Sequence, residues 1–336
     1  MNKQLIIIFM VCLCAVLTSC GTNENGYKAR LNVKTQPVDL RFERYEDVLF
    51  NLDTSNFQAE LMQIQSHYQV FLGGDLSNPD AVKYLKDFAT DPFCTSMYQK
   101  VKTAFPDLKE VKASVESVLS HFHYYYPDIQ LPTQAYTCIT GISADEPAVQ
   151  IIDNILVISL DWYLDSDEVY DQIGMPRYMQ HRTRKATLAR DVAKQLYMTY
   201  LYQWRKQGNI MNEMVYFGRM NYFMEAMCPE MADEILFSWS SEQLSWAKEN
   251  EGGVWADIVG QKRLFDTGLD SYLMFFGDGP FTQAYSDEAP ARLGEYFGTQ
   301  IIRSYMSCHK EMPLQQLISN TDLQAIFQES GYKPKK

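Results

Sequence analysis

The sequence predicts an α+β protein that is predominantly helical and carries one small β-sheet. Along most of the chain, apolar residues recur three and four positions apart, which is the period of a helix with one buried face. Only residues 134–160 combine alternating apolar residues with a two-residue turn signal, as short paired strands do. The 336 residues allow one large domain or two modest ones, and we predict a single domain over residues 29–336.

The first 28 residues carry the features of a lipoprotein signal and a tether. Lys3 precedes an unbroken apolar run of 13 residues, which ends at Leu17 and is too short to span a bilayer comfortably. The run leads into the sequence LTSC, the pattern of a lipobox, in which the cysteine is acylated and becomes the first residue after cleavage. We predict a signal peptide over residues 1–19, lipidation of Cys20 and a flexible tether over residues 20–28. The alternative is an ordinary signal peptide with an incidental cysteine.

Composition restricts the partners and the redox chemistry of the domain. The net charge of −12 argues against nucleic acid or an anionic membrane surface as a partner, so we expect membrane contact through the lipid anchor. Apart from the anchor, the cysteines left after cleavage are Cys94, Cys138, Cys228 and Cys308. They are far apart and include no CxxC pair, so neither a zinc ribbon nor a redox motif is predicted. An exported protein can form disulfides. The simpler alternative is that the cysteines are buried thiols, because Cys138 and Cys308 lie in apolar surroundings.

One strand and four helices are predicted before the β segment. The alternation that starts at Val38 is typical of a half-buried strand. Capping residues at 53–56 and prolines at 79 and 92 mark the starts of three helices. A fourth helix follows Leu108 and is halted by Pro127. We expect these helices to pack on one another.

The β segment predicts a hairpin. Residues 134–142 alternate loosely, and the apolar runs 149–152 and 155–160 are separated only by Asp153 and Asn154. Asp and Asn tolerate the left-handed conformation that a two-residue hairpin turn requires. The two runs are therefore expected to pair antiparallel.

The helix predicted over residues 183–204 is the element around which we expect the chain to pack. One apolar stripe recurs at helical spacing and consists of Ala189, Val192, Ala193, Leu196, Tyr200 and Trp204. Another sector carries Arg190, Asp191 and Lys194, at the i, i+1, i+4 spacing with which a zinc-peptidase helix presents His, Glu and His. Protonated Arg and Lys do not ligate zinc. The simpler interpretation is a solvated charged face with an i,i+3 pair between Asp191 and Lys194.

Further helices are predicted after the central one. They cover residues 211–227, 230–237, 241–248, 290–306, 313–319 and 321–329. Gly294 and Gly298 lie one turn apart in the fourth of these helices. Such a notch allows a second helix to approach closely, because no side chain separates the two backbones.

These motifs, in this order, resemble the GldB family of gliding-motility lipoproteins along nearly the whole chain. The matching stretches are the lipobox and the sequences FER, HYYYP, LDWYL, MPRYM, GRMNYF, GDGPF, APARLGEYFG and IIRSY, which begin at residues 42, 123, 160, 175, 218, 277, 289 and 301. Each is weak by itself, and their common order and spacing make the match specific. The resemblance implies a GldB-like domain that takes part in gliding motility or in the secretion machinery on which gliding depends.

The element over residues 289–305 is also similar to a glycine-rich helix in a family of predicted bacterial zinc proteases. In that family it follows an HExxH helix and a helix with a glutamate just before a glycine. The alignment implied puts the metal-ligand positions on Arg190, Lys194 and Phe217 and the general base on Asp191. Two cations and a phenyl ring then stand where zinc ligands are needed. The resemblance therefore implies a zincin-like, metallopeptidase-like scaffold that has lost its metal and has no cofactor.

We therefore expect a non-catalytic envelope lipoprotein that contacts envelope proteins of the motility or secretion machinery. None of the five histidines has the spacing for a shared metal, and no nucleophile–base constellation is visible. The expected location is the cell envelope, facing the periplasm or the cell surface. The alternatives are a zinc metallopeptidase with an unrecognised ligand set and a solute-binding lipoprotein, which needs an apolar pocket with converging polar groups.

Overall fold

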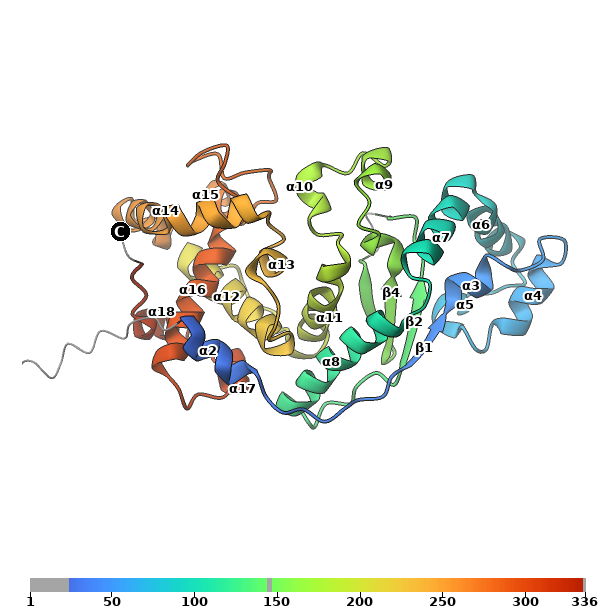
Figure 1. Ribbon diagram of the computed structural model, residues 1–336, viewed down its shortest axis with the longest axis horizontal. Coiled ribbons are helices and arrows are strands. Elements are labelled where there is room, and N and C mark those ends of the chain that lie inside the picture. The colour runs from blue at the N-terminus through green and yellow to red at the C-terminus, as the bar shows by residue number, and fades with distance from the viewer. Residues whose placement is uncertain (1–23, 144–146, 335–336) are drawn as a thin grey trace, which may run out of the picture.

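The computed structural model describes residues 24–143 and 147–334 (Figure 1). The predicted signal peptide, Cys20 and the first residues of the tether lie outside this part of the chain. Within the described residues, no helix has the length and apolar character needed to cross a membrane.

Four short strands form one mixed sheet. They are β1 (Arg41–Arg44), β2 (Gln134–Cys138), β3 (Val149–Ile152) and β4 (Ile155–Ser159), in the spatial order β1-β2-β4-β3. Strand β2 pairs in parallel with β1 and β4, whereas β3 pairs antiparallel with β4. The predicted hairpin is confirmed. Asp153 and Asn154 form its turn with φ values of 48° and 62°, as a type I′ turn requires.

The strand predicted from Val38 begins only at Arg41. The backbone N–H of Val38 donates to Ser120 Oγ, and that of Leu40 donates to Glu116 Oε1, at 3.1 and 2.9 Å. These side chains belong to helix α8 (Lys109–Tyr125). These N–H groups are bound to side chains of α8 and cannot also donate to a neighbouring strand. The segment before Arg41 therefore runs along α8 instead of extending the strand.

Alternation along the strands divides the sheet into two packed faces. Tyr136, Cys138 and Val157 lie in a smaller core, formed with residues from helices α3 (Tyr45–Leu49), α4 (Phe57–Ile64), α5 (Gln69–Leu72) and α6 (Pro79–Thr90). Leu156 and Ile158, on the opposite face, belong to the main core. The main core also receives apolar residues of α7 (Pro92–Ala104) and α8. The sheet is therefore covered on both sides, as its largely apolar strands require.

The central helix is shorter than predicted. Its residues divide into a 3₁₀ turn (Lys185–Thr187), α11 (Leu188–Leu196) and a π-helical turn (Tyr197–Leu201). The N–H of Tyr202 donates to Tyr197 O at 2.9 Å, an i to i+5 bond that closes the last turn. Trp204 lies beyond this turn and is 82% exposed, so its prediction as a core residue was wrong. The apolar stripe is buried only as far as the π-helical turn.

Ten other helices occur in the described part of the chain. They are α9 (Asp167–Gln172), α10 (Arg177–Gln180), α12 (Ile210–Met227), α13 (Asp233–Phe237), α14 (Ser241–Gly260), α15 (Leu269–Phe276), α16 (Leu293–Cys308), α17 (Leu314–Ser319), α18 (Leu323–Ser330) and the N-terminal α2 (Glu24–Leu31). Figure 1 shows α2 and α12 to α18 on one side of α11 and the sheet on the other. Helix α14 continues to Gly260 instead of ending at Lys248, and α15 was not predicted. Helix α11 therefore lies between the two halves of the molecule.

Helices α12 and α16 approach each other at glycines. A Cβ on Gly298 would collide with Met214 O of α12, and a Cβ on Gly218 would collide with Gly298 O. Gly294 faces a different neighbour, because a Cβ there would lie 2.5 Å from the Phe276 ring of α15. The notch predicted for one helix therefore receives two, α12 at Gly298 and α15 at Gly294.

The four cysteines of the domain differ in exposure. Cys94 and Cys138 are buried, and Cys228 is half-buried. Cys138 Sγ lies 3.4 Å from Ser159 Oγ of the neighbouring strand. Cys308 is exposed, so the apolar surroundings predicted for it were wrong. It is the last residue of α16, where the helix leaves the core.

Candidate functional site

Helix α11 carries the charged residues that the sequence placed at a lost metal site. They differ in exposure: Arg190 is only 8% exposed, Asp191 is half-buried and Lys194 is open to solvent. Other charged side chains lie around them, from α16 and from the loops before α11 and α16. The group of seven that we call the charged cluster consists of Arg182, Arg190, Asp191, Lys194, Asp278, Arg292 and Glu295.

Arg190 joins α11 to the end of α13. Its Nη1 donates to Ile235 O at 2.9 Å and to Ser238 Oγ, and its Nε and Nη2 donate to Asp191 Oδ1 at 2.9 and 2.7 Å. Ser238 ends α13 in the left-handed conformation, with φ 53°. A cation suits this position because the last carbonyl groups of a helix carry partial negative charge. The guanidinium of Arg190 is thus buried and hydrogen-bonded within the protein. The simpler interpretation, which placed Arg190 on a solvated face, was wrong.

Asp191 lies between Arg190 and the end of the sheet. Its Oδ2 accepts from the hydroxyl of Tyr163 at 2.9 Å, while its Oδ1 accepts from Arg190. Tyr163 is fully buried, and burial together with the charge of Asp191 holds the pKa of this phenol well above its usual value. The predicted pair with Lys194 is replaced by the salt bridge to Arg190 at 2.7 Å. Both carboxylate oxygens therefore have protein partners.

The side chain of Lys194 is exposed to solvent, although neighbouring elements lie close to its ammonium group. The pKa of its ammonium lies below the usual value, chiefly because neighbouring elements reduce its hydration. The charges of Glu295 and Asp191 act in the opposite direction, and those of Arg190 and Arg292 lower the pKa further. No hydrogen bond or ion pair of Lys194 occurs within residues 24–143 and 147–334.

Arg292 supports the cluster from the start of α16. It occupies the N-cap position with φ 59°, a left-handed conformation that is uncommon outside glycine. Its Nη2 donates to Phe237 O at 2.5 Å, and its Nη1 lies 3.4 Å from Glu295 Oε2. Arg190 and Arg292 thus both bind the final turn of α13, which explains how this short helix is held between α11 and α16.

Asp278 and Arg182 complete the cluster. Arg182 Nη2 lies 2.5 Å from Asp278 Oδ1, and Arg292 Nε lies 3.6 Å from the same oxygen. Burial raises the pKa of Asp278, but the hydrogen bond from Arg182 and the nearby cations lower it by more, so that it lies below the usual value. Asp278 is therefore held as an anion between two arginines.

Phe217 packs on α15, whereas Arg190 binds the end of α13. Its ring stacks on Phe276 of α15 at 5.2 Å, and Phe276 in turn fills the space beside Gly294. Within the described residues, no cation–π contact joins Phe217 to Arg190 or Lys194. Of the four predicted positions, Arg190 and Asp191 form one connected pair, Lys194 lies near Glu295, and Phe217 packs on α15.

The chemistry open to the cluster is that of binding charged groups. Among the residues that the structure describes, no group of three or more His, Cys, Asp or Glu side chains is arranged to hold a metal ion. Each acid of the cluster has an arginine beside it, and Arg190 and Arg292 hold the end of α13. These contacts suit structural stabilisation and the binding of an anion.

Sequence reasoning missed the four residues contributed from outside α11. Arg292 and Glu295 lie in the stretch APARLGEYFG, and Asp278 lies in GDGPF. Both stretches were noted for their resemblance to a family, but nothing in the spacing of the sequence connects them with α11. Arg182, in the loop between α10 and α11, carried no signal of its own. Only the folded chain brings them together.

The fold and the cluster define a class: a largely helical α+β protein with a charged cluster of arginine–acid pairs beside its central helix. A family model described as gliding motility protein GldB matches residues 27–334. The chain belongs to the GldB family. No curated protein and no solved structure matches the chain. Membership supports a gliding-motility-associated lipoprotein of the cell envelope.

Proposed function

We propose that this lipoprotein is a non-catalytic scaffold that acts through protein contacts in the gliding or associated secretion machinery. In this proposal its second half is a metallopeptidase-like arrangement of helices that no longer binds metal. The main support is that Arg190 and Asp191 both form structural hydrogen bonds, which connect α11 with α13 and with Tyr163. A zinc ligand and a general base need free lone pairs directed at the metal site.

An exposed apolar surface supports the second part of the proposal, action through protein contacts. Its residues are Tyr202, Trp204, Phe265, Leu269 and Leu273, which we call the apolar surface. The last four are 82%, 67%, 66% and 53% exposed. The two segments that carry them meet where the N–H of Ile210 donates to Asp266 O at 3.0 Å. Clusters of large exposed apolar side chains are characteristic of interaction sites.

The loop that presents Trp204 is fixed to the body of the protein. Arg205 forms two hydrogen bonds of 2.6 Å with the buried carboxylate of Glu213, and its guanidinium lies 3.7 Å from the centre of the Tyr216 ring. Such bidentate pairs are among the stronger polar contacts in proteins. The neighbouring Trp204 is therefore held outward, which is unfavourable for an isolated protein and favourable for one with a partner.

Crosslinking in intact envelopes tests this surface. We expect the full-length Trp204→Ser/Phe265→Ser variant to lose specific crosslinked products that the wild-type protein forms. The matched control is Tyr84→Ser, which removes a 72% exposed aromatic residue from α6 in the other half of the molecule. Products that persist unchanged in the double variant would show that contacts are made elsewhere.

The enzyme alternative is tested by elemental analysis of the purified full-length protein. The proposal expects less than stoichiometric zinc and no peptidase activity that responds to a chelator. Stoichiometric zinc together with activity lost to a chelator would overturn the non-catalytic assignment.

The proposed ancestry has its own test. Arg190→His, Asp191→Glu, Lys194→His and Phe217→Glu would restore the ligand types of a catalytic zinc site. If the helices kept the ancestral arrangement, the combined variant binds zinc at micromolar or lower concentration and its Tm rises with zinc. A folded variant without zinc binding contradicts the ancestry.

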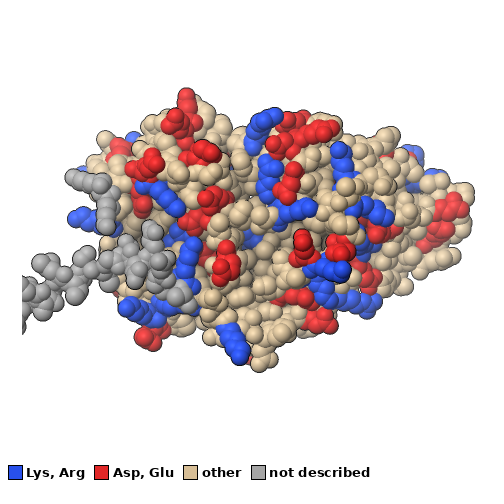
Figure 2. Space-filling view, viewed as in Figure 1, with Lys and Arg blue, Asp and Glu red and all other residues tan. Residues whose placement is uncertain are grey.

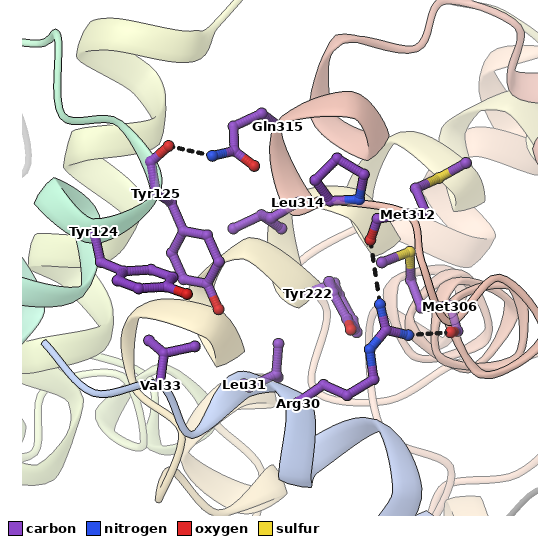
Figure 3. A pocket seen from close by; sticks show the side chains of 11 residues that line it. Arg30, Leu31, Val33, Tyr124, Tyr125, Tyr222, Met306, Met312, Leu314 and Gln315 are labelled. Carbon is purple, nitrogen blue, oxygen red and sulfur yellow. Dashed lines mark hydrogen bonds between the residues drawn. The ribbon is translucent and has the colours of Figure 1, made fainter.

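A cavity between α2, α8 and α16 favours solute binding as a second candidate function. It has a volume of about 360 Å³, and Figure 3 shows the rings of Tyr124, Tyr125 and Tyr222 around it. Arg30 lies at its edge, where it donates to Met306 O at 2.6 Å and to Met312 O at 3.2 Å. In a thermal-shift screen of saccharides and amino acids, a ligand that stabilises the wild type but not Val33→Trp, at the half-buried rim, would favour this candidate.

A further inference from the structure

The charged cluster contains one more cation than it has acids. Three acids have a basic partner each: Asp191 with Arg190 at 2.7 Å, Asp278 with Arg182 at 2.5 Å, and Glu295 with Arg292 at 3.4 Å. Lys194 is the fourth cation and has no such partner in the described part of the chain. Four positive and three negative charges leave a net charge of +1 in a protein whose total is −12.

Two further donors in the cluster are unsatisfied. Arg182 Nε and Arg292 Nε are buried, and neither has a hydrogen-bond acceptor among the residues that the structure describes. A buried donor without an acceptor costs free energy, and the cost is greater when the donor is charged. The exposed ammonium of Lys194 adds three donors to the cluster. Within the described residues, Lys194 therefore offers exposed donors without a partner, beside two buried guanidinium N–H groups that lack a hydrogen-bond acceptor.

The cluster is accessible from solvent. Lys194 is exposed, although its surroundings reduce its hydration, so an ion from solution can reach it. Figure 2 shows that charged side chains of both signs gather over the middle of one face, in the region where Figure 1 places α10 and α11. Partial loss of hydration strengthens the attraction between the ammonium and an anion, because less water screens it.

We propose that the charged cluster binds a single carboxylate group, with Lys194 as its central contact. A singly charged group matches the excess of +1, whereas Asp191, Asp278 and Glu295 would repel a phosphate dianion about twice as strongly as a carboxylate. This inference rests on the proposed scaffold function, and it supplies the chemistry of one partner contact. The carboxylate comes from a protein partner, either from its C-terminus or from an Asp or Glu side chain.

Binding is measured on the full-length protein in detergent, with its lysines converted to ¹³C-dimethyl-lysine for NMR. Lys194 is assigned by the signal absent in Lys194→Gln. At constant ionic strength, acetate should shift this signal saturably, and inorganic phosphate should shift it at least tenfold less effectively. Three acetylated peptides separate the two sources of the carboxylate. The first has a free C-terminal carboxylate, the second is the same peptide with a C-terminal amide, and the third is the amide with an internal Glu.

A second measurement compares variants by the affinity for the best peptide. We expect Lys194→Gln to bind at least tenfold more weakly than the wild type. The matched control is Lys34→Gln, which removes the same charge from an exposed loop outside the cluster and should leave the affinity unchanged. The proposal is overturned if no carboxylate shifts the signal saturably, if phosphate binds more tightly, or if Lys194→Gln binds as the wild type does. Crosslinking through the apolar surface is independent of these results, so the scaffold proposal can stand when the carboxylate site fails.

Discussion

Asp161 is the most completely buried carboxylate in the described part of the chain. It lies in the 3₁₀ turn after β4, Leu160–Tyr163, with no exposed surface. Its Oδ2 accepts from the N–H groups of Thr140 and Ile142, both at 3.0 Å, while its Oδ1 has no acceptor or donor partner within residues 24–143 and 147–334. Burial raises the pKa of Asp161 to about 6, although the backbone hydrogen bonds lower it. Asp161 thus orders the loop after β2, where Ile142 takes a φ of 57°.

The raised pKa of Asp161 predicts a pH dependence of stability. Between an unfolded pKa of about 3.9 and the folded value of about 6, the native protein holds a proton that the unfolded chain has lost. The free energy of unfolding should therefore fall as the pH rises through this interval, by about 3 kcal/mol at most. Asp161→Asn cannot titrate, so the difference between wild type and variant should depend on pH from 4 to 6 and be constant above 7.

Urea unfolding at pH 4.5, 5.5, 6.5 and 7.5 measures this difference. Asp128→Asn is the control, because it removes an exposed carboxylate that forms no hydrogen bond in the described structure. A constant difference for Asp161→Asn over the whole range would show that the carboxylate is already ionised at pH 4.5.

At the scale of elements, the contact between α12 and α16 depends on glycine. Gly218 and Gly298 let the two backbones meet, and Met214 O occupies the space that a side chain on Gly298 would need. Beside this contact, Ile302 of α16 lies 3.0 Å from the position of a Cβ on Gly218, and the side-chain amide of Asn221 of α12 donates to Thr299 Oγ1 of α16 at 2.9 Å. A change of one methyl group must therefore move a helix backbone and cannot be absorbed by a flexible side chain.

Gly298→Ala should destabilise the protein despite the higher helix propensity of alanine. The collision with α12 is expected to cost about 1–3 kcal/mol, the typical range for overpacking. Gly253→Ala is the matched control, since Gly253 lies in α14 with no atom within 4 Å of an added Cβ. That variant should gain about 0.5–1 kcal/mol from helix propensity alone. Thermal unfolding of both variants measures these changes in stability. A raised Tm for Gly298→Ala would contradict the observed packing.

At the scale of the whole molecule, the central helix connects two halves. A chain of hydrogen bonds runs from Tyr163, beside the sheet, through Asp191 and Arg190 to Ile235 O at the end of α13. The pair that sequence spacing linked to a metal site therefore acts in the described structure as a bridge between the sheet and the helical half. Replacing either residue is expected to affect both halves.

Membrane attachment is predicted to depend on Cys20. The family supports a lipoprotein, and the sequence LTSC predicts acylation of Cys20. Cys20→Ser should therefore move the protein from the detergent phase to the aqueous phase, or leave an unprocessed precursor, because acyl chains supply the binding energy. Phase partition and mass spectrometry of the N-terminal peptide measure the change. Unchanged membrane partition would refute lipidation of this residue as the anchor.

Local signals in the sequence predicted much of the fold. The Asp153–Asn154 hairpin and the helices that begin at Pro79 and Pro92 are confirmed, because turn and cap residues act on the backbone next to them. The end of the central helix was predicted wrongly at Trp204. Apolar periodicity does not distinguish a buried residue from one on an exposed apolar surface, and the π-helical turn that separates them leaves no clear pattern.

The sequence by itself determined the class of the protein, the order of its elements and the family to which it belongs, since these depend on local patterns and their order. It also determined that Arg190, Asp191 and Lys194 lie within one turn of a helix. The tertiary structure decided what these residues contact. Asp278, Arg292 and Glu295 are more than 80 positions away in the chain, and only the packing of α16 against α12 and α15 brings them to α11. Arg190 is thereby buried and paired with the half-buried Asp191, while the exposed Lys194 has no ion pair in the described part of the chain.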